Sequence, residues 1–207
     1  MALLLTTDQV RNAINMDACL RSCRLAYELL GKNEAINRPR SQVHLSMGEP
    51  GLYYLFKSME GAVPELGVNA VRMTSQMAHW HRVEGGLRKE KQTVAQPGYL
   101  VGLILLFDIK TCKLLCIMPD GIIDRMRVGA TNGLAAEYLS RRDAKILALL
   151  GTGNHARTQV LAFTQIRRLS RVKVYSPNGD HRKQFCAEMS ETAGVECEAV
   201  SSPEEAA

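Results

Sequence analysis

Residues 147–160, LALLGTGNHARTQV, decide the fold of this 207-residue chain. An apolar, strand-like run stops at a glycine-rich turn, and a helix-like segment follows directly. The turn consists of Gly151, Thr152, Gly153, Asn154, His155 and Ala156, which form the pattern G-x-G-x-x-A. Gly151 allows a tight turn, Gly153 lets the backbone approach a pyrophosphate, and Ala156 keeps the helix close to the sheet. Free N–H groups at the helix start would face the anionic charge, so the stretch predicts a dinucleotide-binding turn.

The segments around this turn alternate between strand and helix patterns. Strands are predicted at 145–150, 172–175 and 195–200, with helices at 155–166 and 182–192. The run 145–150 is continuously apolar, which is typical of a parallel strand buried on both faces. This β-α-β-α-β order is that of half a doubly wound sheet, and the chain stops after its third strand. The strand that would flank 145–150 in a complete sheet is then missing, so we expect 145–150 to form an exposed apolar edge that favours aggregation.

The end of the second strand bears on the choice of cofactor. An acid there would bind the ribose hydroxyls of NAD, but the strand ends at Tyr175 and Ser176. Ser176, Asn178 and Arg182 could instead bind a 2′-phosphate through hydrogen bonds and charge. These residues favour NADP, while Asp180 lies close enough to keep NAD open.

Residues upstream of the turn have a different pattern. The sequence Thr6-Thr7-Asp8-Gln9 fits a helix capping box, and apolar residues recur at helical spacing from 17 to 30. Residues 41–118 form short β-like segments, with a hairpin at 109–112, and predict a mostly antiparallel sheet. The fold class is therefore α/β, with an N-terminal α+β substrate and dimerisation domain over 1–125. An incomplete Rossmann-type doubly wound domain over 126–207 follows it.

Two polar segments of the sheet region could carry chemistry. His79 and His81 would lie on one face of a strand, but no third metal ligand is in sight, so we interpret them as strand surface beside one buried Trp80. Residues 88–91, Arg-Lys-Glu-Lys, follow a glycine pair and are interpreted as a solvated loop. A loop after a strand is also a place where substrate-binding cations are carried.

The composition argues against a nucleic-acid-binding protein and against a membrane protein. The chain is 46% hydrophobic, and its net charge of +5 comes from 26 basic and 21 acidic residues scattered along it. That scatter argues against a nucleic-acid partner, and no apolar run is long enough for a membrane helix. The six cysteines show no metal-binding spacing, so we expect reduced thiols, no metal and a cytoplasmic protein.

Several segments resemble the ornithine cyclodeaminase and mu-crystallin family. The resemblance is carried by DGIIDRMRVGATNGLAAEYLSRRDAKILALLGTGNHA, and it extends back through NRPRS, FKSMEGAVPELGV and LVGLILLFD. It implies a dimer with a substrate domain and a Rossmann domain. The family includes cyclodeaminases, which are lyases, as well as alanine and opine-type dehydrogenases, ketimine reductases and ligand-binding crystallins.

The resemblance also implies roles for individual residues. Arg40 matches the arginine that binds the substrate carboxylate, and Arg127 matches the arginine between that carboxylate and the nicotinamide. Further family cofactor positions are those of Asn154, His155, Ser176 and Asn178.

One family position departs from the pattern. The family's active-site lysine falls on either Asn69 or Arg72, and neither can act as a proton-transfer base near neutral pH. Arg72 could still hold a carboxylate, and Lys91 could supply an amine. Ornithine is therefore a less suitable substrate than another amino or imino acid.

The sequence thus leads to one main hypothesis and two alternatives. The main one is an NAD(P)-dependent enzyme that transfers hydride at the α-carbon of an amino or imino acid, with arginines holding the substrate. The alternatives are a crystallin-like protein that binds NAD(P)H and a small ligand without turnover, and an inactive fragment. We expect residues 1–207 alone to be inactive.

Overall fold

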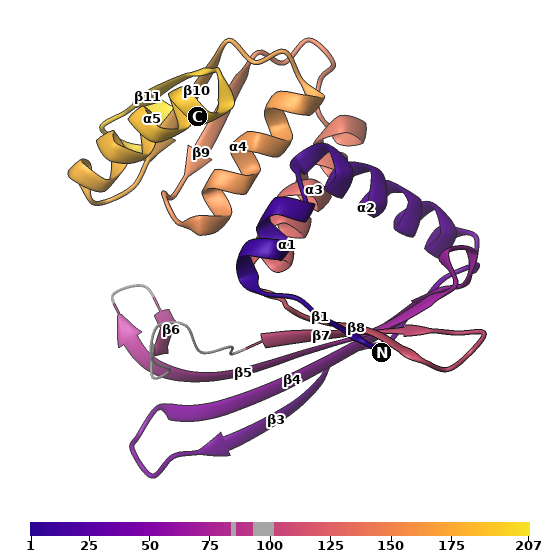
Figure 1. Cartoon of the computed structure of the whole chain (residues 1–207). Helices are drawn as coiled ribbons and strands as arrows, with labels where there is room; N and C mark the ends of the chain where they lie inside the picture. Colours follow the sequence, from indigo (N-terminus) through magenta and orange to yellow (C-terminus); the bar gives the residue numbers. More distant parts are fainter. Residues whose placement is uncertain (84–85, 93–101) are drawn as a thin grey trace. The chain divides into compact units, whose positions relative to one another are not determined.

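A computed structural model describes residues 1–83, 86–92 and 102–207 (Figure 1). The chain divides into two compact units, which are described separately below. Unit 1 comprises Met1–Val10 and Ala26–Gly121, and unit 2 comprises Arg11–Leu25 and Ile122–Ala207. The boundary at residue 125 between functional domains stays a prediction.

The chain begins with a short strand, β1 (Leu3–Leu4), and two helices, α1 (Thr7–Ala13) and α2 (Met16–Gly31). The predicted capping box precedes α1. The backbone N–H of Thr6 donates to Oε1 of Gln9 at 2.9 Å, and the N–H of Gln9 donates to Oγ1 of Thr6 at 3.3 Å. This reciprocal pair satisfies two donors that a helix start leaves free.

Unit 1 is built on a mostly antiparallel sheet, as predicted. Its strand order is β1-β8-β7-β5-β4-β2, with β3 also paired to β4 and β6 to β5. Only the short β1–β8 pair is parallel among the described pairs of this sheet. The strands are β2 (Ile36–Asn37), β3 (Ser41–Ser46), β4 (Leu52–Val63), β5 (Val68–Val83), β6 (Gly86–Gln92), β7 (Gly102–Asp108) and β8 (Leu114–Pro119). A 3-10 turn, η1 (Pro64–Leu66), joins β4 to β5.

The basic run 88–91 lies in β6, so the loop interpretation was wrong. This strand pairs with β5 from Val83↔Gly86 to Met77↔Gln92. The 16-residue β5 extends beyond its pairing with β7, and β6 pairs with the part of that edge that β7 leaves open. Charged side chains are common on such edge strands, because they discourage further pairing.

The two histidines lie on one face of a strand, as predicted, but the tryptophan between them is not fully buried as predicted. The rings of His79 and His81 stack with centroids 5.6 Å apart on one face of β5. Trp80, on the other face, is only partly buried as a residue. The described residues contain no group of three or more His, Cys, Asp or Glu arranged to hold a metal ion.

Unit 2 has the predicted α/β order, and this confirms the fold class. Its three parallel strands run in the order β11-β10-β9, with Leu147 opposite Val172 and Val174 opposite Ala199. The elements are α3 (Gly121–Leu139, whose first residue falls in unit 1), β9 (Ile146–Leu150), α4 (Asn154–Ile166), β10 (Arg171–Tyr175), α5 (Gly179–Ala193), β11 (Glu196–Ala199) and α6 (Pro203–Ala206).

The core of unit 2 is centred on β10. Val160, Val172, Val174, Phe185 and Met189 are almost completely buried there. In contrast, β9 is mostly exposed, with Ile146 57% and Leu150 66% accessible, which confirms the predicted exposed apolar edge at 145–150. The cause is its position, because β9 forms an edge of the described parallel sheet.

Helix α3 packs closely against α4 through small residues. A side chain at Gly129 would place its Cβ 2.5 Å from the carbonyl oxygen of Thr158. A Cβ at Gly133 would lie 3.1 Å from the Cβ of Ala162. Glycines four residues apart therefore let the two helix backbones approach, and α3 supplies the functional candidate Arg127 from this fixed position.

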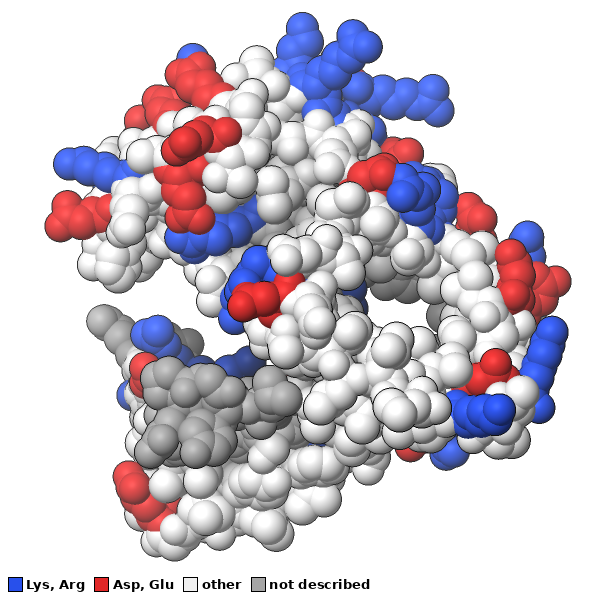
Figure 2. Space-filling view, viewed as in Figure 1, with Lys and Arg blue, Asp and Glu red and all other residues white. Residues whose placement is uncertain are grey.

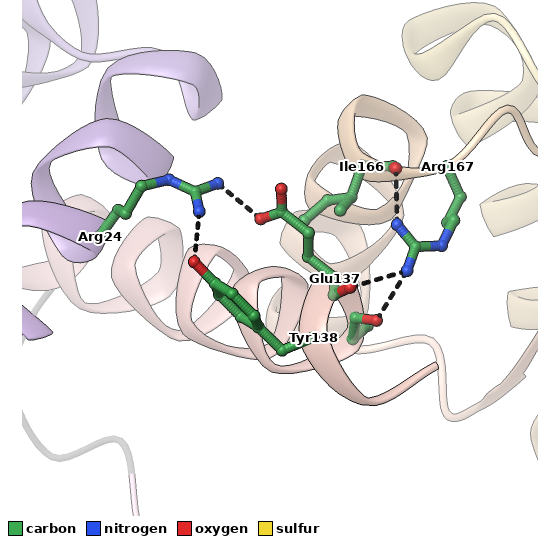
Figure 3. Close-up of polar contacts among 6 residues, drawn as sticks. Arg24, Glu137, Tyr138, Ile166 and Arg167 are labelled. Atoms are coloured by element: carbon green, nitrogen blue, oxygen red, sulfur yellow. Dashed lines mark hydrogen bonds and ion pairs between the residues drawn. The ribbon is translucent and has the colours of Figure 1, made fainter. Parts of the chain in front are cut away.

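Arginines fix the C-terminal end of α3 (Figure 3). The guanidinium of Arg167 donates to the carbonyls of Ala136 and Glu137 at 3.1 and 2.9 Å, which satisfies acceptors that the helix end leaves free. Arg24 of α2 donates to the Glu137 carboxylate and, at 2.9 Å, to the Tyr138 hydroxyl. The carbonyl contacts and the ion pair both hold α3 within unit 2.

Candidate dinucleotide and substrate sites

The glycine turn connects the end of β9 to the start of α4. Gly151 has φ +110°, a conformation that residues with a side chain rarely adopt. Its N–H donates to the carbonyl oxygen of Tyr175 at 2.7 Å, and Oγ1 of Thr152 donates to Oγ of Ser176 at 3.3 Å. These bonds fix the turn against the end of β10.

Gly153 leaves the start of α4 uncovered. It is the N-cap residue with φ −80° and ψ −177°, and no side chain caps the helix. A Cβ at this position would meet no heavy atom of the described residues within 4 Å beyond its chain neighbours. Asn154 and His155 begin the helix and are exposed, while Ala156 is 9% accessible and belongs to the core. The helix start thus offers free N–H donors and open space, which fits an approaching phosphate.

Arg157, which the sequence analysis did not single out, stabilises the turn through hydrogen bonds. Its Nη1 donates to the carbonyl oxygen of Thr152 at 3.1 Å. Its Nε and Nη2 both donate to the carboxylate of Glu188 on α5, each at 2.6 Å, and the guanidinium lies 5.3 Å from the Phe185 ring centroid. The hydrogen bonds from Arg157 lower the pKa of Glu188 below its usual value. Only the fold brings α5 to this arginine, so sequence spacing gave no signal.

The end of β10 has no carboxylate where an NAD-binding acid would stand. Ser176 is 6% accessible, and its hydroxyl donates to the carbonyl of Asn178 at 3.2 Å. Oδ1 of Asn178 caps α5 by accepting from the N–H of His181 at 2.9 Å. Asp180 is exposed in the first turn of α5.

Arg182 folds back onto this strand end. Its Nη1 donates to the carbonyl of Ser176 at 2.9 Å, and its guanidinium lies 5.4 Å from the ring centroid of Tyr175. Nε of Arg182 is buried with no hydrogen-bond partner among the described residues. The strand end therefore carries a fixed cation with an unused donor.

The residues predicted to bind substrate are distributed over both units. Arg127 lies on α3 of unit 2, where its Nη2 donates to Oδ1 of Asp124 at 2.9 Å and its side chain is 49% exposed. In unit 1, Arg40 is exposed just before β3, and Lys91 is exposed in β6. Nε of Arg72 donates to the buried carboxylate of Asp120 at 2.7 Å.

The register of β5 separates the two candidates for the family lysine position. Side chains alternate between the faces of a strand, so Asn69 and Arg72 lie on opposite faces. Arg72 shares its face with Lys57 of β4, which the sequence analysis did not single out. Burial, followed by the charges of Lys89, Arg40, Lys91 and Arg72, lowers the pKa of Lys57. The three predicted cations of unit 1, Arg40, Arg72 and Lys91, thus lie close enough to Lys57 for their charges to act on it.

Both signs of charge are spread over the visible face of the molecule (Figure 2). No helix in the described residues combines the length and apolar character needed to cross a membrane.

Unit 2 has a Rossmann-type sheet with an uncovered glycine turn, an architecture that binds dinucleotides in many α/β proteins. The chain belongs to the ornithine cyclodeaminase/mu-crystallin family, whose model matches residues 68–207. This confirms the resemblance noted in the sequence.

Two curated relatives illustrate the range of this similarity. A Δ(1)-pyrroline-2-carboxylate reductase of Bacillus cereus is 23% identical over 204 residues, which is 99% of this chain and 58% of the relative. An ornithine cyclodeaminase of Agrobacterium fabrum is 29% identical over 102 residues, which is 49% of this chain and 28% of the relative.

Solved structures support the same fold. The Δ(1)-pyrroline-2-carboxylate reductase of Thermococcus litoralis, in complex with NADH and L-proline, matches with a TM-score of 0.78 and 29% identity over 99% of this chain and 58% of that one. An archaeal alanine dehydrogenase dimer with bound NAD also gives 0.78, at 23% identity over 99% of this chain and 57% of that one. The chain thus spans little more than half the length of these relatives.

Proposed function

We propose that this chain belongs to an NAD(P)-dependent oxidoreductase that transfers hydride at the α-carbon of an amino or imino acid. The observation that carries the proposal is the uncovered helix start at Gly153, in a chain whose relatives include pyrroline-2-carboxylate reductases and alanine dehydrogenase. A bound nicotinamide supplies or accepts the hydride. The chain's own residues would bind the pyrophosphate and orient the substrate.

The cofactor side of the proposal uses the turn and the end of β10. The N–H groups at the start of α4 would bind the pyrophosphate, and the bond from Arg157 to the carbonyl of Thr152 would hold the turn in place. Ser176, Asn178 and Arg182 surround the position of the adenosine ribose. Because no carboxylate follows β10 directly, a 2′-phosphate would meet a cation and not a like charge, so we propose a preference for NADP over NAD.

The substrate side of the proposal uses cations. Arg40 and Arg127 would bind the α-carboxylate, as the family resemblance implies, and Lys91 could supply an amine for proton transfer. Arg72 is held by Asp120, so it would act through charge. Asn69 lies on the face opposite Arg72 and provides no base, which favours a substrate other than ornithine.

The test uses the full-length protein that contains this chain, with one variant on each side of the reaction. Gly153→Val should abolish NAD(P)H binding measured by calorimetry, while the fold persists, because φ −80° is allowed for valine and its Cβ would meet no neighbour. Arg127→Ala should retain cofactor affinity but lose catalytic efficiency by roughly tens to hundreds of fold, as expected for an unpaired carboxylate.

The outcomes separate the possibilities. Unchanged NAD(P)H affinity in Gly153→Val would remove the dinucleotide assignment. A full-length protein that binds NAD(P)H but changes no nicotinamide absorbance with any amino or imino acid would favour the binding-protein alternative.

The cofactor preference has its own test. NADPH should bind about tenfold more tightly than NADH, since one charged contact contributes roughly 1.5–3 kcal/mol. The double variant Ser176→Asp with Arg182→Ala should reverse that order. Ser176→Asn, which matches aspartate in size without its charge, should keep it. Equal affinities of the unmodified chain for both cofactors would contradict the preference.

The proposal extends to assembly and compartment. We propose a homodimer, by analogy with the alanine dehydrogenase dimer, and a small amino or imino acid as the reaction partner. All six cysteines are free thiols, which fits a reducing compartment such as the cytoplasm.

A further inference from the structure

One face of the unit 1 sheet gathers hydrogen-bond donors. Lys57 lies opposite Thr74, Lys91 opposite Ala78, and Lys89 opposite Trp80. Side chains that are two residues apart on a strand share a face, so Gln76 belongs to the same set. The donor face is defined by Lys57, Gln76, Trp80, Lys89 and Lys91.

Two of these donors are buried without an acceptor. Nε2 of Gln76 and Nε1 of Trp80 have no hydrogen-bond partner within the part of the chain that the structure describes. A buried donor that makes no hydrogen bond destabilises the protein, and native structures contain few of them. Two on one face indicate a missing acceptor.

The charge of this face leads to the same conclusion. Burial and the charges of Lys91 and Arg40 lower the pKa of Lys89, as burial and its neighbours do for Lys57. Nζ of Lys89 lies 5.3 Å from the ring centroid of Trp80. None of the described residues that pair across β4, β5 and β6 on this face is acidic. The nearby Asp120 accepts from Arg72.

We propose that the donor face binds the second carboxylate of a dicarboxylic amino or imino acid. This rests on the proposed function, in which Arg40 takes the α-carboxylate. A carboxylate offers about four acceptor sites, so it can accept from the two buried side-chain donors and still bind one or two of the lysine ammonium groups. A side-chain amide would leave the lysine charges unpaired, and a side-chain ammonium would be repelled.

The ligand test compares pairs that differ in charge but hardly in shape. Calorimetry on the whole chain should show L-glutamate binding about tenfold or more tightly than L-glutamine, and L-aspartate more tightly than L-asparagine. Equal affinities, or tighter binding of L-ornithine, would overturn the proposal. Inorganic phosphate that bound as tightly as L-glutamate would also overturn it, because the face would then be a general anion site.

Variants locate the effect. Lys57→Met should bring the glutamate-to-glutamine affinity ratio close to one. Arg88→Met, an equal loss of charge on the opposite face of β6, should leave the ratio unchanged. Trp80→Phe keeps an aromatic side chain but removes the unpaired N–H, so it should lower the glutamate-to-glutamine affinity ratio, a ratio that lost packing alone would not change. If Lys57→Met and Trp80→Phe both kept the unmodified glutamate-to-glutamine affinity ratio, the donor face would not be the carboxylate site.

The oxidoreductase proposal and the dicarboxylate proposal can fail independently of each other. If the chain binds glutamate selectively but the full-length protein shows no nicotinamide reduction with it, the donor face stands and the oxidoreductase proposal does not. Turnover that favours glutamine or another neutral amino acid would preserve the oxidoreductase and reject the dicarboxylate.

Discussion

The contact between Arg157 and Glu188 connects the glycine turn to α5. Both guanidinium bonds to the carboxylate are 2.6 Å long, and a third bond from Arg157 reaches the carbonyl of Thr152. A two-point contact fixes the plane of the guanidinium, which a single lysine bond could not do. This pair therefore positions the turn.

A pH-dependent stability difference should follow from this pair. The pKa of Glu188 is lowered, so its stabilisation is fully present above the unfolded-state pKa and is lost as pH falls through the folded-state value. Glu188→Gln should lower the free energy of unfolding by about 0.5–1 kcal/mol at pH 7, a figure reduced for solvent screening because both side chains are a third or more exposed. Urea denaturation should show this deficit shrinking below about pH 4.

Glu191→Gln provides the control for that series, since it neutralises an exposed carboxylate of the same helix. A deficit in Glu188→Gln that stayed constant down to pH 3 would show that the pair contributes no charge-dependent stability.

Among the elements, α3 depends on glycine at its contact with α4. At Gly129 an added Cβ meets backbone atoms of Thr158 at 2.5 and 2.8 Å, and backbone cannot move aside as a flexible side chain can. At Gly121, in the first turn of the same helix, an added Cβ meets nothing within 4 Å. The same substitution should therefore have opposite effects at the two positions.

Gly129→Ala should destabilise the chain by about 1–3 kcal/mol, because the two helices must move apart. Gly121→Ala should be neutral or stabilising by up to about 1 kcal/mol, because alanine restricts the unfolded chain and favours helix. Denaturant midpoints with unchanged slopes measure both effects. Equal midpoints for the two variants would contradict the close approach of α3 and α4.

For the whole molecule, the exposed apolar strand β9 is the feature that most favours self-association. It forms an edge of the parallel sheet, with Ile146 and Leu150 more than half exposed. Unpaired backbone groups beside apolar side chains allow strands of two molecules to pair.

We therefore expect concentration-dependent self-association of the 207-residue chain, measured by static light scattering. Ile146→Lys should reduce it, because a charge on an edge strand opposes pairing. Ile109→Lys, at an exposed site of the β7–β8 hairpin, should not. Identical scattering from the chain and both variants would show that β9 is not the contact.

The sequence by itself determined the elements whose signals are local. The turn at Gly151 and Gly153, the capping box at Thr6, and the alternation of strand and helix after residue 145 all depend on residues close together in the chain. Backbone conformation and periodic burial follow from such neighbours, so the fold class could be predicted.

Tertiary structure alone decided the pairings between distant residues. Residues 88–91 became a strand because β5 extended far enough to pair with them. The bonds of Arg157 to Glu188 and the gathering of Lys57, Gln76 and Trp80 on one face join segments that no local spacing relates. Such contacts depend on strand register and packing, which are set only when the whole sheet assembles.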